Sequence, residues 1–568
     1  STPSNSSAAS DVYKRQRLLS MAKVAGLYVV VRIGPYADAD LSRGGFPGWL
    51  TRQKVDARSD DPVYLAAVDE WLTRVNAIIS RHQYDGDKGN VILYQVEDRL
   101  GDPSPVKQRY MAHLYAKARH DGITLPIFHN ETGPVGDWLS VARSGEDVAS
   151  LIDLHGFSIN TTRFCDTQNQ PLREAAPPDL GYYNLDNSAS FLKRPATSLI
   201  TIEDGSADYW GSNEQYNCLA NSNDERHEML ILGNNLINGL TNQTLRMVYG
   251  GINWGWLGQS GRITSFDYGA PIDEARNLRP KADGLKRLGQ FISTFSDITK
   301  MMPGSVIVPT SSHIRVLHNV NPDTNSHLFF ITHKPANSLH DSKFTFSVAL
   351  PDGTYTLPEE GNLELNGHDS KYLIAGFNLG RNRLVYSTSQ FQTMITQGEH
   401  DIALFNGRQG EAGEIVLRYE TKPRVTVIEG DARYFYDPAR HDLRLNYIHG
   451  GLTRIKIENG GPAPLILLIG DEKESARFSR FSTDAGDVLV FGPSLVRQAS
   501  STDLTLSLKG DTGSQETLEV WAPPAITTLE WNSHHVAFSR NFLNGNFIAK
   551  DFLPEPENFT LPDLMTLD

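Results

Sequence analysis

The first half of the chain alternates amphipathic segments with short apolar runs. Residues 64–82 carry apolar side chains at three- and four-residue intervals, which predicts a helix with one buried face. Residues 17–25 and 106–119 are predicted helices as well. Mostly apolar runs, which predict buried strands, occupy residues 27–35, 91–95, 124–129, 152–157, 199–203 and 245–250. This alternation predicts an α/β domain with a parallel sheet, and the leading form is a (β/α)8 TIM barrel.

The second half of the chain has a different pattern. From about residue 300 the helical periodicity stops, and short alternating runs follow one another between Gly, Pro, Asn and Asp turns, which predicts all-β, β-sandwich-like domains. The run that begins at Pro423 is a candidate start of a second β module. The predicted organisation is therefore a partial TIM barrel over residues 17–300, an all-β domain over 301–422, a second all-β module over 423–552 and a Pro-rich linker over 553–568.

Residues 1–16 do not match the rest of the sequence. They begin with a Ser- and Ala-rich stretch that lacks the apolar core of a signal peptide. The stretch 11–16 (DVYKRQ) resembles the translation of a sequencing adapter. We therefore predict that residues 1–16 are a non-native artefact, the alternative being a short disordered arm.

Composition excludes several functions. The chain has 568 residues, with 53 Lys and Arg against 67 Asp and Glu and a formal net charge of -14, which argues against nucleic-acid binding. No run approaches the roughly 18 apolar residues of a membrane span. Cys165 and Cys218 lack metal-site spacing and are either two buried thiols or a disulfide. N-glycosylation triplets, which favour an oxidising compartment and a secreted protein, begin at Asn130, Asn160, Asn242 and Asn558.

Acidic residues follow several of the predicted strands. Retaining glycosidases need two carboxyl groups about 5–5.5 Å apart, one to attack the sugar and one to protonate the leaving oxygen. In a barrel such groups lie at the carboxyl ends of strands. For any single residue, the alternative is a solvated loop acid or a helix cap. The candidates are Asp38 and Asp40, Glu97 and Asp98, Asp153, and Glu203 and Asp204.

Longer motifs resemble glycoside hydrolase family 35, the β-galactosidases, in their fungal multidomain form. The strings RIGPYADAD (32–40) and GGFPGWL (44–50) resemble the strand-three signature of that family. The strings GGINWG (250–255) and TSFDYG (264–269) resemble its strand-eight signatures, and LVFGPSLVR (489–497) is similar more loosely. The resemblance covers nearly everything from residue 17 onward. It implies a secreted, monomeric enzyme that hydrolyses terminal β-D-galactosyl residues by double displacement, without cofactor or metal.

The resemblance also implies roles for individual residues. Glu203, in the run IEDG, takes the place of the family nucleophile after strand seven. The sugar-binding Asn-Ala-Glu of the family falls on Asp38, Ala39 and Asp40, and a family Tyr falls on Tyr268. A disulfide between Cys165 and Cys218 is implied in the same way. The strand 27–35 would be strand three of the barrel, so strands one and two would be missing from this chain.

The general-acid position departs from the family pattern. The family has Gln-Pro-Glu-Asn-Glu-Tyr, whereas this chain has Gln-Val-Glu-Asp-Arg-Leu over residues 95–100. Arg99 thus replaces the acid, Asp98 replaces a sugar-binding Asn, and Ile159 replaces a sugar-binding Tyr. A guanidinium cannot donate a proton usefully near neutral pH. Arg99 could also pair with Glu203 and lower its pKa.

Four interpretations follow from that departure. The enzyme is active with a relocated acid, Glu97 or Asp98; it is a galactoside-binding pseudoenzyme; the gene sequence contains errors at this point; or the protein is structural, with the barrel as a scaffold. The pseudoenzyme and the enzyme both predict a saturable sugar site, and the structural protein does not.

Overall fold

The computed structural model of this chain divides into two compact units, Ser1–Arg279 and Pro280–Asp568. Each unit is described by itself. The structure describes residues 5–36, 45–86, 88–132, 152–160, 199–203, 218, 224–240, 242–251, 265, 267, 269–336, 338–502, 504–541, 543 and 545–554.

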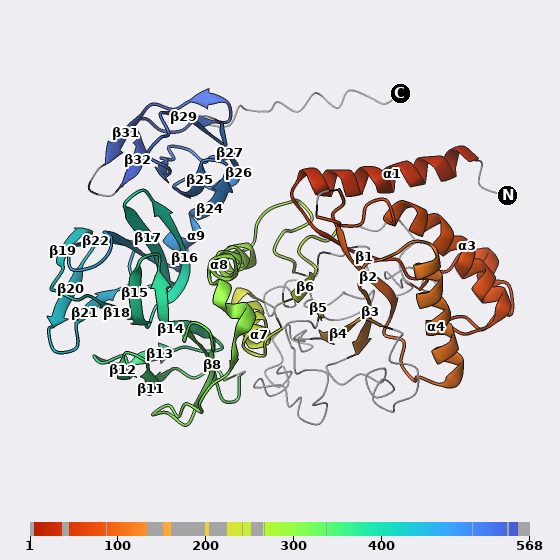
Figure 1. Cartoon of the computed structure of the whole chain (residues 1–568), viewed down its shortest axis with the longest axis horizontal. Helices are drawn as coiled ribbons and strands as arrows, with labels where there is room; N and C mark the ends of the chain where they lie inside the picture. Colours follow the sequence, from red (N-terminus) through yellow and green to blue (C-terminus); the bar gives the residue numbers. More distant parts are fainter. Residues whose placement is uncertain are drawn as a thin grey trace. The chain divides into compact units, whose positions relative to one another are not determined.

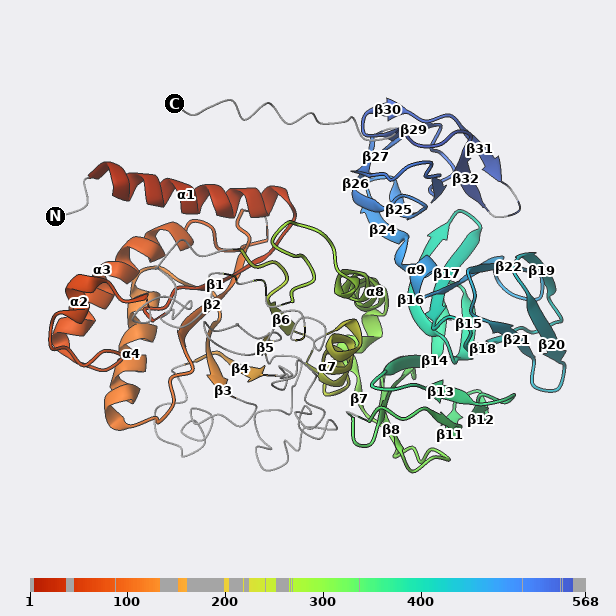
Figure 2. The ribbon, with the colours of Figure 1, turned by 180° about the vertical axis from the view of Figure 1, so that it is seen from behind.

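The first unit is built on a parallel sheet of six strands whose order in space follows their order along the chain (Figures 1 and 2). The strands are β1 (Val29–Arg32), β2 (Val91–Asp98), β3 (Ile127–Thr132), β4 (Leu154–Asn160), β5 (Leu199–Glu203) and β6 (Asn242–Arg246). Each overlaps or directly adjoins a predicted strand, and every neighbouring pair is parallel. The prediction of an α/β domain with a parallel sheet is confirmed, and the TIM barrel stays a prediction.

Helices connect these strands. They are α1 (Asn5–Val24), α2 (Gly48–Thr51), α3 (Pro62–Ile79), α4 (Pro105–His120) and α7 (Glu225–Ile237). The helix α3 begins where it does because the Asp61 side chain accepts hydrogen bonds from the amides of Val63 and Tyr64, and Pro62 occupies the first turn. Its apolar face packs with β1, β2 and α4 in one core. The helix α1 runs through residue 16 without a break.

The second unit begins with α8 (Pro280–Thr294) and the 3-10 helix η6 (Ser296–Lys300) and is otherwise strand-rich, which confirms the all-β prediction. One eight-stranded sheet contains, in spatial order, β20 (Ala432–Asp437), β21 (Asp442–Ile448), β18 (Ala412–Arg418), β15 (Asn382–Ser387), β14 (Lys371–Leu379), β9 (His327–His333), β8 (Ile314–Val320) and β7 (Met302–Pro303). A five-stranded sheet contains β16 (Gln390–Gln397), β17 (His400–Gly407), β23 (Leu465–Asp471), β22 (Leu452–Glu458) and β19 (Arg424–Glu429). Two hairpin-sized sheets pair β10 (Ser342–Phe344) with β13 (Leu363–Leu365) and β11 (Phe346–Leu350) with β12 (Gly353–Leu357).

The last part of the second unit has two further sheets. The first contains β24 (Phe478–Thr483), β25 (Gly486–Phe491), β28 (Glu519–Trp521), β32 (Asn546–Ala549) and β31 (Phe538–Asn541). The second contains β26 (Leu495–Thr502), β27 (Thr505–Asp511), β29 (Thr528–Trp531) and β30 (His534–His535). The short helix α9 (Glu472–Ala476) precedes these sheets. Their shared core is centred on the fully buried Trp531.

The structure moves two of the predicted boundaries. Strands on either side of residue 422 share both large sheets, since β18 pairs with β21 and β17 pairs with β23. No domain boundary therefore falls at residue 422, and the next group of sheets begins near Phe478 instead. The helix α8, which the prediction placed in the barrel, belongs to the second unit because Phe291 packs against Tyr372 at a ring distance of 4.4 Å.

Candidate functional site

The carboxyl ends of the parallel strands in the first unit bring polar residues to one edge of the sheet. Asn160, Glu203 and Arg246 are register partners on β4, β5 and β6. Asp98 and Asn130 are register partners on β2 and β3. Because side chains at the carboxyl edge of such a sheet face the same crevice, this edge is the candidate functional site.

Glu203 is the last residue of β5, where the sequence placed the nucleophile. Its strand is held on both sides by parallel neighbours, so its backbone position is set by the sheet rather than by a loop. Only the backbone of β5 is described, so the predicted role of Glu203 and its predicted pairing with Arg99 stay predictions.

Arg99 lies directly after β2 at the same edge. Its Nε donates a hydrogen bond to Oγ of Ser158 at 3.2 Å, and its amide donates to the Asn130 carbonyl at 2.7 Å. The side chain therefore reaches past β3 to β4, along the edge that carries Glu203. Arg99 has a φ of 48°, in the left-handed region that costs a non-glycine residue energy, so the turn depends on surrounding contacts.

Glu97, two residues before Arg99 in the same turn, is held by contacts of its own. It is 0 % exposed, and it too has a positive φ of 55°. Its Oε2 accepts hydrogen bonds from Nε and an Nη of Arg58 at 3.1 and 2.7 Å, and its Oε1 accepts one from the Tyr110 hydroxyl. Burial raises the pKa of Glu97, and the Arg58 guanidinium acts against that rise.

This environment argues against Glu97 as a substitute general acid. Both carboxylate oxygens bind groups of the protein itself, and the side chain has no access to solvent. A general acid must reach the leaving oxygen within hydrogen-bond distance, directly or through one water. The geometry instead makes Glu97 a structural residue that holds the turn between β2 and α4.

Asp98, the other candidate acid, is also tied to protein groups. Its Oδ1 accepts hydrogen bonds from the side-chain amides of Asn130 at 2.7 Å and Gln95 at 3.2 Å, and Arg32 forms an ion pair with Oδ2. It is 8 % exposed. Asp98 thus links β1, β2 and β3 at the site edge. Asp98 and Arg99 both lie at this edge, and their predicted roles in the site stay predictions.

Arg58 was missed by the sequence reading. Its guanidinium binds Glu97, donates a 2.6 Å hydrogen bond to the Asp98 carbonyl, and lies over the Tyr36 ring at 4.3 Å. It lies in the stretch before α3, 39 positions from Glu97, and no motif or periodicity marks it. Only the fold places this residue beside the turn that carries Arg99.

One predicted acid lies at the wrong end of the sheet. Asp153 precedes β4, so it belongs to the amino-terminal edge, opposite Glu203. It binds Arg119 and accepts a 3.0 Å hydrogen bond from the Tyr115 hydroxyl. The structure therefore corrects Asp153 from a site residue to a partner of α4.

Several predicted residues cannot be placed in the site. Asp38, Ala39, Asp40, Asp204, Tyr268, Cys165 and Asn558 lie outside the described residues. Ile159 and Asn160 are on β4, with only their backbone described. Cys218 is buried, and the predicted disulfide stays a prediction.

The asparagines of two glycosylation triplets, Asn130 and Asn242, differ in exposure. Asn130 is 2 % exposed, and its amide nitrogen, the atom that would carry a glycan, donates to Asp98. This burial is incompatible with a glycan at Asn130 in the folded protein. Asn242 is exposed at the start of β6, and glycosylation there stays a prediction.

The described ranges carry neither a cluster of metal ligands nor a membrane-spanning helix. No three His, Cys, Asp or Glu side chains converge there as metal ligands would. No helix in that part of the chain is long and apolar enough to cross a membrane.

Comparison with protein families gives consistent matches along the chain. The model of glycosyl hydrolases family 35 matches residues 5–292. The models of β-galactosidase domain 2 and domain 3 match residues 296–478 and 469–548. The boundary near residue 478 agrees with the start of the last two sheets.

Fungal proteins resemble nearly the whole chain. Probable beta-galactosidase B of Aspergillus fumigatus is 30% identical over 575 residues, covering 96% of this chain and 55% of that protein. The same-named protein of Sclerotinia sclerotiorum and probable beta-galactosidase A of Aspergillus fumigatus are each 29% identical over 96% of this chain, which covers 56% and 55% of them. The chain thus spans about half the length of these relatives. A solved family 39 glycoside hydrolase from Bacteroides cellulosilyticus has a TM-score of 0.33 at 10% identity, covering 54% of this chain and 61% of that one, which is too low to inform the fold.

Proposed function

Because this chain belongs to glycoside hydrolase family 35, we propose that it is a retaining glycosidase that cleaves terminal β-D-galactosyl residues. The observation that carries the proposal is the family match over residues 5–292 together with Glu203 at the carboxyl end of β5. The names of the fungal relatives support galactosides as the substrate class. They lend no support to a pseudoenzyme.

In this proposal Glu203 attacks the anomeric carbon and forms a covalent glycosyl-enzyme, which water then hydrolyses. Arg99 stands at the position of the general acid and cannot protonate the leaving oxygen near neutral pH. The first step therefore depends on the leaving group. An aryl galactoside, whose phenolate leaves without much acid assistance, should react far better than lactose.

The other parts of the proposal concern the whole protein. The six-stranded parallel sheet and its helices would belong to a TIM barrel, as the family resemblance implies. The protein would be secreted and monomeric, with a disulfide between Cys165 and Cys218. Its partner would be a β-galactoside.

The test compares p-nitrophenyl β-D-galactoside with lactose. We expect turnover of the aryl substrate, with lactose slower by about 10²–10⁴-fold, the usual contribution of a general acid. Glu203→Gln should abolish both reactions. Asp153→Asn, which changes a carboxylate at the opposite edge of the same sheet, is the matched control and should keep both. Hydrolysis of neither substrate by the unmodified chain, or unchanged hydrolysis by Glu203→Gln, would overturn the proposal.

A further inference from the structure

The second unit contains a cavity that the family assignment does not explain. Its volume is about 590 Å³, and it is lined by the loop 358–363, by β18 at 412–414, by the turn 430–433 and by β21 at 446–448. Small-molecule sites occupy roughly 300–1,000 Å³. The cavity is partly open to solvent and lies within that range of volumes.

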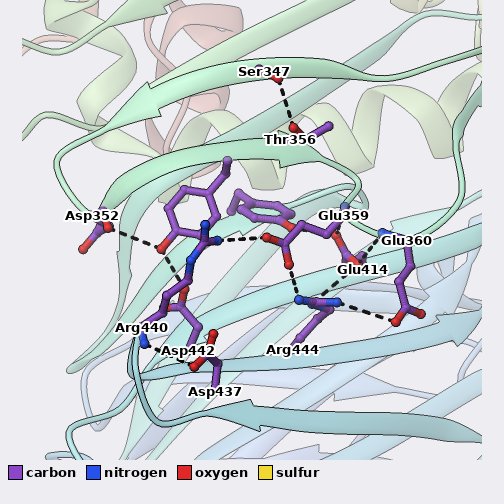
Figure 3. A network of polar contacts seen from close by, with 12 residues as sticks. Ser347, Asp352, Thr356, Glu359, Glu360, Glu414, Asp437, Arg440, Asp442 and Arg444 are labelled. Carbon is purple, nitrogen blue, oxygen red and sulfur yellow. Dashed lines mark hydrogen bonds and ion pairs between the residues drawn. The ribbon is translucent and has the colours of Figure 1, made fainter.

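Polar contacts connect the loop at 359–360, next to this cavity, to β18 and β21 (Figure 3). Glu414, 1 % exposed on β18, accepts hydrogen bonds from the Glu359 amide at 2.8 Å and from the Asn446 side chain at 3.0 Å. Arg444 forms ion pairs with Glu359 and, at 3.6 Å, with Glu360. The loop that closes one side of the cavity is thus fastened to the sheet at several points, and the cavity is preorganised.

The chemistry of the lining narrows the class of ligand. It carries three carboxylates against the single guanidinium of Arg433, which lies 3.9 Å from Glu360, and the net charge of -2 disfavours phosphate or another anion. Exposed acceptors at Glu360 and Asp431 stand beside exposed donors at Arg433 and Asn362. Ile448, 58% exposed, adds apolar surface.

A metal ion fits this lining less well than a neutral polar molecule. Among the described residues no three carboxylates or histidines converge as metal ligands. The carboxylates of Glu359 and Glu360 are already paired with Arg444. A sugar ring offers hydroxyls that both donate and accept along its edge, together with an apolar C–H face. Those are the features that the acceptors, donors and apolar side chain of this lining complement.

Two glycines of the cavity lining, Gly361 and Gly450, have open space at the Cβ position, because an added Cβ would meet no other atom within 4 Å. Gly361 has a φ of +81° and needs to be glycine for its backbone, but Gly450 has no such constraint. A larger side chain at Gly450 therefore adds bulk at the cavity lining without displacing the protein.

We propose that this cavity in the all-β unit is a second saccharide-binding site, distinct from the carboxyl edge of the parallel sheet. It takes a neutral mono- or disaccharide, held by Asn362, Asp431 and Arg433 and bounded by the loop that Glu414 fastens. Only the choice of a galactoside as the probe rests on the proposed function. The lining itself is the argument for a sugar.

The experiment is calorimetric titration of lactose into the full chain carrying Glu203→Gln, so that hydrolysis does not interfere. We expect Gly450→Leu, added to this chain, to abolish one equivalent of binding or weaken it at least tenfold. Asn362→Ala, which adds no bulk, should weaken the same equivalent several-fold. The matched control is Gly289→Leu on α8, where an added Cβ also meets nothing within 4 Å. It should leave binding unchanged.

Melting temperatures that agree between Gly450→Leu and the control show that lost binding is not unfolding. The inference is overturned if Gly450→Leu and Asn362→Ala both bind lactose as Gly289→Leu does, or if calcium chloride rather than lactose binds in a Gly450-sensitive manner. Hydrolysis reports on the proposed function separately. If Gly450-sensitive lactose binding persists but galactosidase activity is absent, only the proposed enzymatic function is refuted. If galactosidase activity is present but no lactose binding depends on Gly450, only the second site is refuted.

Discussion

Replacing Arg58 by methionine should destabilise the first unit strongly, because it leaves the Glu97 carboxylate buried without its cation. Arg58 donates to Oε2 of Glu97 at 3.1 and 2.7 Å and to the Asp98 carbonyl at 2.6 Å. Methionine keeps much of the apolar stem but none of these contacts. Glu97 would retain the Tyr110 hydroxyl and the Asp98 amide as partners.

The size of the loss follows from the burial of Glu97. Breaking one side of a buried ion pair costs about 3–5 kcal/mol. Protonation sets an independent upper limit on the free-energy cost of Arg58→Met, because Glu97 can become neutral by binding a proton. That costs about 1.4 kcal/mol for each pH unit above an unfolded pKa of about 4.3, hence roughly 3.7 kcal/mol at pH 7. This upper limit of roughly 3.7 kcal/mol lies within the range of about 3–5 kcal/mol for a broken buried ion pair.

The same reasoning fixes the pH dependence. Burial raises the pKa of Glu97 above its unfolded value, so between those two values the folded state binds more protons than the unfolded state. Stability from this group therefore falls as pH rises through that window. Loss of Arg58 removes the cation that opposes this rise, so the pKa of Glu97 in the folded state increases further and the pH window extends to higher pH. The free-energy cost of Arg58→Met should thus shrink to about 1.6 kcal/mol or less at pH 5.5, by the same 1.4 kcal/mol per unit.

Urea unfolding of the full chain at pH 5.5 and pH 7 measures both effects. Arg74→Met is the matched control, since Arg74 pairs with Glu70 on the exposed face of α3 and such pairs contribute about 0.3–0.5 kcal/mol. Glu97→Gln combined with Arg58→Met should recover part of the loss, because no buried charge remains. The reasoning fails if Arg58→Met costs no more than the control at pH 7, or if its cost grows toward acid pH.

Three further outcomes are expected. Arg99→Glu restores a carboxyl group at the acid position and should raise lactose turnover by about 10²–10⁴-fold while adding an alkaline limb to the pH–rate profile; an unchanged profile would contradict the assignment. Burial lowers the pKa of His327 to about 4, so the unfolded state takes up its proton first and the second unit should lose stability as pH falls from about 6.5 to about 4; His327→Gln should flatten that loss in thermal melts. Phe291→Ala should cost about 3–5 kcal/mol in the unfolding transition of the second unit, and an effect confined to the first unit would show that α8 belongs there.

The order of elements was predictable because it depends on local pattern. Apolar runs identified all six parallel strands, and the spacing from Leu65 to Ile79 identified α3. Each of these signals lies within one short stretch of chain. The same holds for Glu203, since the end of an apolar run is visible in the sequence itself.

The environment of the site was not predictable in the same way. Glu97 and Asp98 look equivalent in the sequence, as neighbouring acids at the end of a strand. In the structure, Glu97 is buried and binds Arg58 and Tyr110. Asp98 instead binds Arg32 and Asn130. Which partners each one meets depends on residues far away along the chain. The pattern of residues along the chain does not show which remote residues will contact each other, unless a known motif contains both.

The boundaries between modules show the same limit. The turn before Pro423 looks like a module start, but β18 pairs with β21 across it. Strand pairing between distant segments is a property of the assembled sheet.

The sequence by itself therefore determined the kind of fold in each half, the family, and the position of Glu203, because periodicity and short motifs are local. Only the tertiary structure decided that Glu97 supports the site turn through Arg58, that Asp153 lies at the opposite edge, and that the all-β unit carries a partly open cavity of about 590 Å³. Those features arise from hydrogen bonds and packing between segments that are remote in sequence, and they exist only once the chain has folded.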